Sequence, residues 1–183
     1  GNEPAGNGTN NGNEQGAAAL PVCVDAEELA FLTLVNNYRA ENGLGAFSLS
    51  PALSTAAKAH SQDMAAKNYF EHEGLDGSTF SQRIIAAGYN GNPTAENIFA
   101  GDQTAAGAFE SWKNSPPHNA NMLSPNSLAI GIGRAFDAGS EWGWYCTTTF
   151  GDTADAACGG PNPDGQANDQ DDQTGTGGNG GAD

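Results

Sequence analysis

Apolar residues recur at helical spacing in the first part of the chain that is rich in them. Asp25 and Glu28 form a capping-box pair, in which each side chain can bond the backbone N–H of the other. The leucines and the valine that follow continue at helical intervals until Gly43, a residue that commonly ends helices. This pattern predicts a helix over residues 26–42.

The next segments carry equally clear start and stop signals. Ser50 followed by Pro51 supplies an N-cap and a proline at the first helical position, which predicts a second helix over residues 51–67. Two shorter helices are expected where a glycine or a pair of prolines ends the pattern, at residues 78–87 and 104–114.

The last third of the chain changes from helical to strand periodicity. Leu128, Ile130 and Ile132 alternate with small residues, and residues 142–150 are a run of aromatic and β-branched side chains. We expect these two segments to form an antiparallel hairpin, with a further short strand at residues 97–100. Because helices do not separate every pair of strands, the order favours an α+β fold, a small antiparallel sheet between helical layers.

Composition divides the chain of 183 residues into three parts. Residues 1–21 and 159–183 are dominated by Gly, Asn, Ala, Gln and acidic residues, and such segments bury too little apolar surface to offset the loss of chain entropy. We therefore expect low-complexity tails at both ends and one folded domain over residues 22–158.

The net charge of −16 narrows the classes of partner. A chain this acidic repels polyanions, so we expect no nucleic-acid partner. No apolar run approaches the roughly 20 residues that cross a bilayer, so we expect no transmembrane segment. The chain begins at Gly1 rather than at Met, which suggests that an export signal has been removed. We expect a secreted or cell-surface protein.

Three cysteines, Cys23, Cys146 and Cys158, lie near the two ends of the expected domain. In an exported protein two of them are expected to pair, and three pairings are open. We favour Cys23 with Cys158, which would join the ends of the domain, because Cys146 falls inside an expected strand and can simply be buried there.

Five strings of the sequence occur in the order and at the separations of a bacterial CAP domain, the superfamily of cysteine-rich secretory proteins, antigen 5 and pathogenesis-related 1 proteins. They are LVNNYRAENGL, YFEHEG, AENIFAG, SWKNSPPHNANML and AIGIGRAF…WYCTTTFG. Each string is unspecific alone, but five in register are specific. The chain thus resembles this family over residues 27–151, which implies an α-β-α sandwich, export from the cell and a central cleft.

The resemblance also implies which residues form the cleft. The family builds it from two histidines and two glutamates, and three of these match His72, Glu96 and His118. In the animal and plant relatives the second glutamate follows a helical tryptophan by three positions. The tryptophan here is Trp112, and the position three residues later is Ser115.

These cleft residues allow two interpretations. Two neutral imidazoles and a carboxylate would make an open site for zinc or another divalent metal, with water as the fourth ligand. Alternatively, Glu96 fixes a histidine tautomer within a hydrogen-bonded network that joins two loops. We rank a structural or metal-binding role for His72 and His118 above a catalytic one. No other cofactor is expected.

Two further features have simple structural interpretations. His60 lies on the apolar side of the second expected helix, which is typical of a buried, hydrogen-bonded histidine. Gly131 and Gly133 do not open a helix as a phosphate-binding loop would, so we expect them to allow close packing instead.

Three functional hypotheses follow. The first is a secreted or surface-associated protein that binds an unknown extracellular ligand or surface component through the cleft, without catalysis. The second is a metal-assisted hydrolase or protease at the His/Glu cleft. The third is a structural subunit of an extracellular assembly, in which the tails connect copies of the chain.

Overall fold

The computed structural model describes residues 23–155, and its two long helices begin and end as the capping signals predict. Helix α1 (Ala26–Glu41) starts with a complete capping box between Asp25 and Glu28. Helix α2 (Pro51–Lys67) starts at Ser50, whose hydroxyl accepts the N–H of Leu53. Both helices therefore obtain their first-turn hydrogen bonds from residues close by in the sequence.

The shorter helices include one that the sequence pattern did not predict. Helix α3 (Phe80–Ala86) and helix α4 (Ala105–Lys113) fall inside their expected ranges. Helix α5 (Pro116–Met122) begins with the two prolines that end α4, so the same pair closes one helix and opens the next. Proline suits a first helical turn because the N–H that it lacks has no partner there.

Four strands form one sheet in the order β1-β3-β4-β2. Strands β3 (Ala129–Phe136) and β4 (Trp144–Gly151) form the predicted antiparallel hairpin, and β2 (Pro93–Ala100) pairs antiparallel with β4. Strand β2 begins four residues earlier than expected. The two-residue β1 (Ser48–Leu49), which was not predicted, pairs parallel with β3 and makes the sheet mixed.

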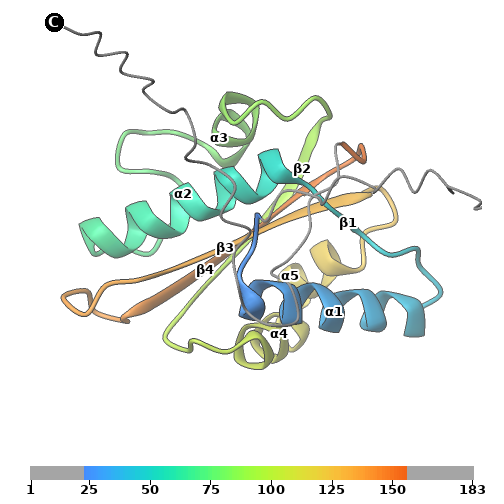
Figure 1. The fold of residues 1–183 in the computed structure, drawn as a ribbon, viewed down its shortest axis with the longest axis horizontal. Helices are drawn as coiled ribbons and strands as arrows, with labels where there is room; N and C mark the ends of the chain where they lie inside the picture. The colour runs from blue at the N-terminus through green and yellow to red at the C-terminus, as the bar shows by residue number, and fades with distance from the viewer. Residues whose placement is uncertain (1–22, 156–183) are drawn as a thin grey trace, which may run out of the picture.

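Helices cover both faces of this sheet, which confirms the predicted α+β sandwich. Helix α2 packs on β3 and β4, with α3 beside it against β2, while α1, α4 and α5 lie on the opposite face (Figure 1). The larger apolar core fills the space between the sheet and this second layer, where Phe31, Trp112 and Phe150 are almost fully buried.

Strand β3 and helix α2 touch through the glycines of the AIGIG segment. A methyl group added at Gly131 would lie 2.0 Å from the backbone carbon of Leu53, and one at Gly133 would lie 2.2 Å from the nitrogen of Lys58. Both are far inside the contact distance of real side chains. The predicted packing role of these two glycines is confirmed.

Several predictions fall on residues outside the described range. The expected tails, 1–21 and 159–183, lie there, and so do the ends of the 22–158 domain. Cys158 lies there as well, so its pairing with Cys23 stays a prediction. Within the described range, Cys146 carries a free thiol in strand β4.

Candidate functional site

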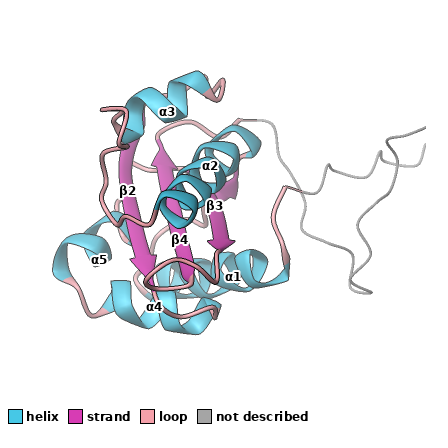
Figure 2. Ribbon diagram, turned by 90° about the vertical axis from the view of Figure 1, so that its left-hand side faces the viewer, coloured by secondary structure: helices cyan, strands magenta, loops and turns pink. Residues whose placement is uncertain are grey.

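The buried carboxylate of Glu96 is the centre of the candidate site. Glu96 lies in β2, the edge strand of the sheet, which runs between α3 and α5 (Figure 2), and the Glu96 side chain is only 2% exposed. One carboxylate oxygen, Oε1, lies 2.9 Å from Nδ1 of His72, and the other, Oε2, accepts a hydrogen bond from Nη2 of Arg83 at 2.8 Å. Both oxygens are therefore engaged within the protein.

Arg83 is the residue of this site that sequence reasoning missed. It extends from α3, and besides its bond to Glu96 it donates from Nη2 to the carbonyl oxygen of His72 at 2.9 Å. Its Nη1 donates to the carbonyl oxygen of Ser78 at 2.7 Å. One guanidinium thus neutralises the buried carboxylate and binds the loop between α2 and α3 at two points, His72 and Ser78.

His72 presents one ring nitrogen to solvent. Its Nδ1 faces the carboxylate of Glu96, which can only accept, so Nδ1 carries the proton of the neutral ring. The lone pair is then on Nε2, and the side chain is 54% exposed. The position therefore offers a hydrogen-bond acceptor, or a metal ligand, whose orientation is fixed by Glu96.

His118 enters the site from α5 and has a weaker partner. Its Nδ1 lies 2.9 Å from the hydroxyl of Ser115, a residue that precedes the helix and makes no capping bond with its side chain. Burial lowers the pKa of His118, and the charge of protonated His72 lowers it further. The two imidazoles are thus close enough to interact electrostatically, and His118 favours its neutral form.

Amide side chains fix α5 against the edge of the sheet. Asn97, next to Glu96 in β2, donates to the carbonyl oxygen of His118 at 3.2 Å and accepts from Asn121 at 2.8 Å. On the neighbouring helix, the indole of Trp112 donates to the carbonyl oxygen of Ile98 at 3.0 Å. These bonds hold His118 and Glu96 in one rigid frame.

The donor set does not fit the three-ligand metal site that the resemblance allows. Both oxygens of Glu96 are used by His72 and Arg83, so this carboxylate orients a histidine rather than facing a metal ion. Within residues 23–155, no group of three His, Cys, Asp or Glu side chains is arranged to hold a metal. The imidazoles of His72 and His118 remain as a pair of potential ligands.

His60 is buried as predicted, on the inner side of α2. It is 1% exposed, and its Nε2 donates to the carbonyl oxygen of Glu71 at 3.0 Å. Burial lowers its pKa, so the ring is neutral near pH 7. Glu96 raises the pKa of His60 and Arg83 lowers it, both less than burial does, but no hydrogen bond among the described residues joins His60 to His72 or His118.

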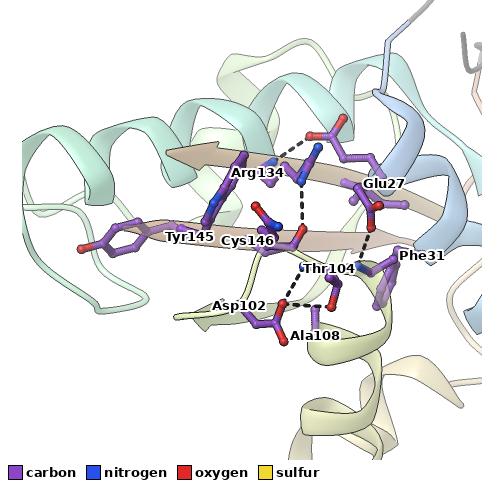
Figure 3. Close-up of a pocket in the computed structure, with 13 residues that line it drawn as sticks. Glu27, Phe31, Asp102, Thr104, Ala108, Arg134, Tyr145 and Cys146 are labelled. Carbon is purple, nitrogen blue, oxygen red and sulfur yellow. Dashed lines mark hydrogen bonds between the residues drawn. The ribbon is translucent and has the colours of Figure 1, made fainter. Parts of the chain in front are cut away.

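A small cavity lies on the face of the sheet that α1 and α4 cover, between α1, the start of α4 and β4 (Figure 3). Two hydrogen bonds lie in its walls. The backbone N–H of Ala105 donates to the carboxylate of Glu27, and the guanidinium of Arg134 donates to the carbonyl oxygen of Gln103. The cavity volume of about 10 Å³ is that of a single water site. It is too small for a ligand.

Comparison with known proteins identifies the family of the chain. The sequence model of the Cysteine-rich secretory protein family, CAP, matches residues 32–149. The chain is 37% identical over 125 residues to the uncharacterized protein YkwD of Bacillus subtilis, an alignment that covers 68% of this chain and 48% of YkwD. The chain thus spans about half the length of this relative.

Two solved structures share the fold. An extracellular protein containing an SCP domain from Bacillus anthracis matches with a TM-score of 0.60 at 23% identity, over 68% of this chain and 40% of that one. An outer surface protein from Borrelia burgdorferi matches with a TM-score of 0.63 at 20% identity, over 70% of this chain and 93% of that one. None of the helices in residues 23–155 is long and apolar enough to span a membrane.

Proposed function

The chain belongs to the cysteine-rich secretory protein (CAP) family. On that basis we propose that it is an extracellular binding domain. Its ligand would bind at His72 and His118 and would not be hydrolysed there. Its structural neighbours are an extracellular and an outer surface protein, which supports the location. The hydrogen bonds of Glu96 support a site that binds without hydrolysing.

The observation that carries the proposal is the saturation of Glu96. A general base or a metal-bound water needs a carboxylate or imidazole that is free to exchange a proton with the substrate. Glu96 is buried and bonded to both His72 and Arg83, and Ser115 stands where the relatives of the resemblance have their second carboxylate. Neither Glu96 nor Ser115 therefore offers a carboxylate that is free to act as a base, and Nε2 of His72 is left as the candidate base of the hydrolase alternative.

The available groups also limit the chemistry of the ligand. His72 offers a lone pair on Nε2 that suits a donor such as a hydroxyl or an amide N–H. The net charge of −16 disfavours an anion. We therefore expect an uncharged ligand with hydrogen-bond donors, such as part of a glycan.

The direct test is NMR of the intact chain with labelled histidine rings. Uncharged glycan fragments, such as oligomers of N-acetylglucosamine, are titrated into the wild type, into a His72→Ala, His118→Ala variant and into His60→Gln, which removes a histidine outside the cleft. We expect shifts of the His72 and His118 ring signals that saturate, and binding that persists in His60→Gln but not in the double variant.

The same samples test the hydrolase alternative. They are incubated with Zn²⁺ and with peptide and ester substrates, and zinc binding is measured by calorimetry. Because only two imidazoles are available, we expect zinc to bind weakly and no substrate to be cleaved. Sub-micromolar zinc binding together with hydrolysis, both lost in the double variant, would replace the binding proposal with the metal-assisted hydrolase. The absence of any ring shift would remove the reason for placing the ligand in this cleft.

A further inference from the structure

Arg39 of helix α1 is a buried cation that no carboxylate of the described chain neutralises. It is 3% exposed, and none of the salt bridges within residues 23–155 includes it. Burying a charge away from water is unfavourable, and burial lowers the pKa of this guanidinium. Other polar groups must therefore stabilise the charge.

The groups that stabilise Arg39 are backbone carbonyls. Its Nε donates to the carbonyl oxygen of Gly45 at 2.7 Å, and its Nη1 donates to those of Met122 and Ser124, both at 2.9 Å. Met122 is the last residue of α5, and Ser124 follows it by two positions. One buried side chain of α1 thus holds the end of the helix that carries His118.

Helix α5 depends on contacts of this kind because it is short and poorly capped at its start. It has seven residues, fewer than an isolated helix needs to be stable in water. Its first two residues are prolines, which have no N–H to donate, and the side chain of Ser115 makes no capping bond. The carbonyls at the other end carry the negative end of the helix dipole, where a cation is favourable. The rest of the domain therefore has to set the position of α5.

Two parts of the domain hold α5 by hydrogen bonds. Toward the sheet, Asn97 donates to the carbonyl oxygen of His118 at 3.2 Å. Toward α1, Arg39 holds the carbonyl of Met122, about one helical turn after His118. A shift of this end would move the imidazole of His118 relative to that of His72, which a different segment carries.

We propose that Arg39 is a positioning residue of the cleft, which sets the place of His118 by holding the carbonyl end of α5 and does not touch the ligand. The use of the cleft rests on the proposed function, but the position of α5 can be measured without a ligand. Arg83 bonds two carbonyls of the loop that carries His72. Each of the two imidazoles is then placed by an arginine that bonds the backbone of its segment.

The test compares variants of Arg39 with a neighbouring control in the intact chain. Arg39→Lys keeps the charge and Arg39→Gln keeps a donor, but neither has the fork that reaches Gly45 and the end of α5 together. Asn36→Ala is the matched control. Asn36 lies one turn earlier on α1 and bonds the backbone of Phe47 twice, and among the described residues it makes no hydrogen bond to α5. Urea midpoints show how far each variant is destabilised as a whole.

Two measurements report the position of α5 without a ligand. Native-state hydrogen exchange compares the amides of α5 with those of α4. We expect the Arg39 variants to speed exchange in α5 at least about tenfold more than in α4, because they release one helix locally. In NMR spectra the ring signals of His118 should shift and those of His72 should stay in place. Asn36→Ala should leave the ratio of exchange rates and both sets of ring signals unchanged.

A ligand probe then connects the position of α5 to the cleft. Oligomers of N-acetylglucosamine are titrated into the same samples, and we expect binding to weaken at least about fivefold in the Arg39 variants and less than about twofold in Asn36→Ala. Equal acceleration of exchange in α5 and α4, unchanged ring signals of His118, or equal weakening in the control would overturn the proposal. If the wild type binds no oligomer, the proposed ligand class fails, while exchange and ring signals still decide the role of Arg39.

Discussion

Substituting Gly131 by alanine would place a methyl group inside the backbone of α2. The added Cβ would lie 2.0 Å from the carbonyl carbon of Leu53 and 2.3 Å from the nitrogen of Ser54. Since real Cβ atoms essentially never approach another atom closer than 3.0 Å, α2 would have to move away by at least 1.0 Å, the difference between 3.0 Å and 2.0 Å. Backbone atoms, unlike a side chain, cannot rotate out of the way.

The movement would stretch hydrogen bonds that join α2 to the sheet. Thr149 donates to the carbonyl oxygen of Leu53 at 3.0 Å, and the N–H of Ile132 donates to the hydroxyl of Ser54 at 3.4 Å. Losing these two bonds costs about 1 kcal/mol each, and overpacking typically costs about 1–3 kcal/mol. We therefore expect Gly131→Ala to lower the free energy of unfolding by about 3–5 kcal/mol, a large part of the stability of a typical domain.

Urea unfolding followed by tryptophan fluorescence measures this loss. Gly45→Ala is the control, because a Cβ at Gly45 meets no atom within 4 Å and its backbone is not left-handed. We expect this control to be neutral or to gain up to about 1 kcal/mol from the reduced entropy of the unfolded chain. A loss below about 1 kcal/mol for Gly131→Ala would show that α2 does not rest on β3 as the structure has it.

Three further predictions concern the buried ionisable groups. Arg83→Met leaves the carboxylate of Glu96 without its cation and should cost about 3–5 kcal/mol in urea unfolding, clearly more than Arg83→Lys; equal losses would contradict the charge argument. Burial lowers the pKa of His60 and His118, so below about pH 7 the unfolded chain binds more protons than the folded chain does. The free energy of unfolding should therefore fall as the pH drops from about 7.5 to 5. Each of the two histidines contributes at most about 1.4 kcal/mol per pH unit. His60→Gln should reduce this slope, and an unchanged slope would refute the role of His60. Cys146 is half-buried, and desolvation raises its thiol pKa to about 12, so alkylation at about pH 8, read by mass spectrometry, should be much slower in the folded than in the unfolded chain. Labelling at equal rates in the two states would contradict the raised pKa.

The parts of the fold that local chemistry determines could be predicted from the sequence. Ser50 and Pro51, an N-cap followed by proline, predict the start of helix α2 correctly. The same signal, Ser115 before two prolines, stands before α5, but there it coincides with the end of α4, and the end of a helix explains it equally well. Strand β1 could not be predicted, because its two residues are defined solely by pairing with β3, which is distant in sequence.

The candidate site shows the same limit. His72, Glu96 and His118 could be named because the resemblance pointed to them. Arg83 could not, because nothing in the sequence around α3 distinguishes an arginine that faces inward from one in solvent. Its role depends on Glu96, 13 residues later, and on the loop before α3. The chain has only six lysines and arginines, and this scarcity was the one reason that the sequence offered to consider Arg83 as a partner for a buried carboxylate.

His72 and His118 differ in how firmly their protons are placed, and this difference bears on the ligand that we propose for them. Glu96 can only accept, so it fixes the proton of His72 on Nδ1 and leaves an acceptor at Nε2. The hydroxyl of Ser115 can donate or accept, so His118 can present either a donor or an acceptor at its Nε2. A carboxylate at position 115 would have fixed both rings as acceptors, which is the arrangement that a metal ion needs. With serine there, the pair can match a group that both donates and accepts, such as a hydroxyl, and this favours an uncharged ligand over a metal ion.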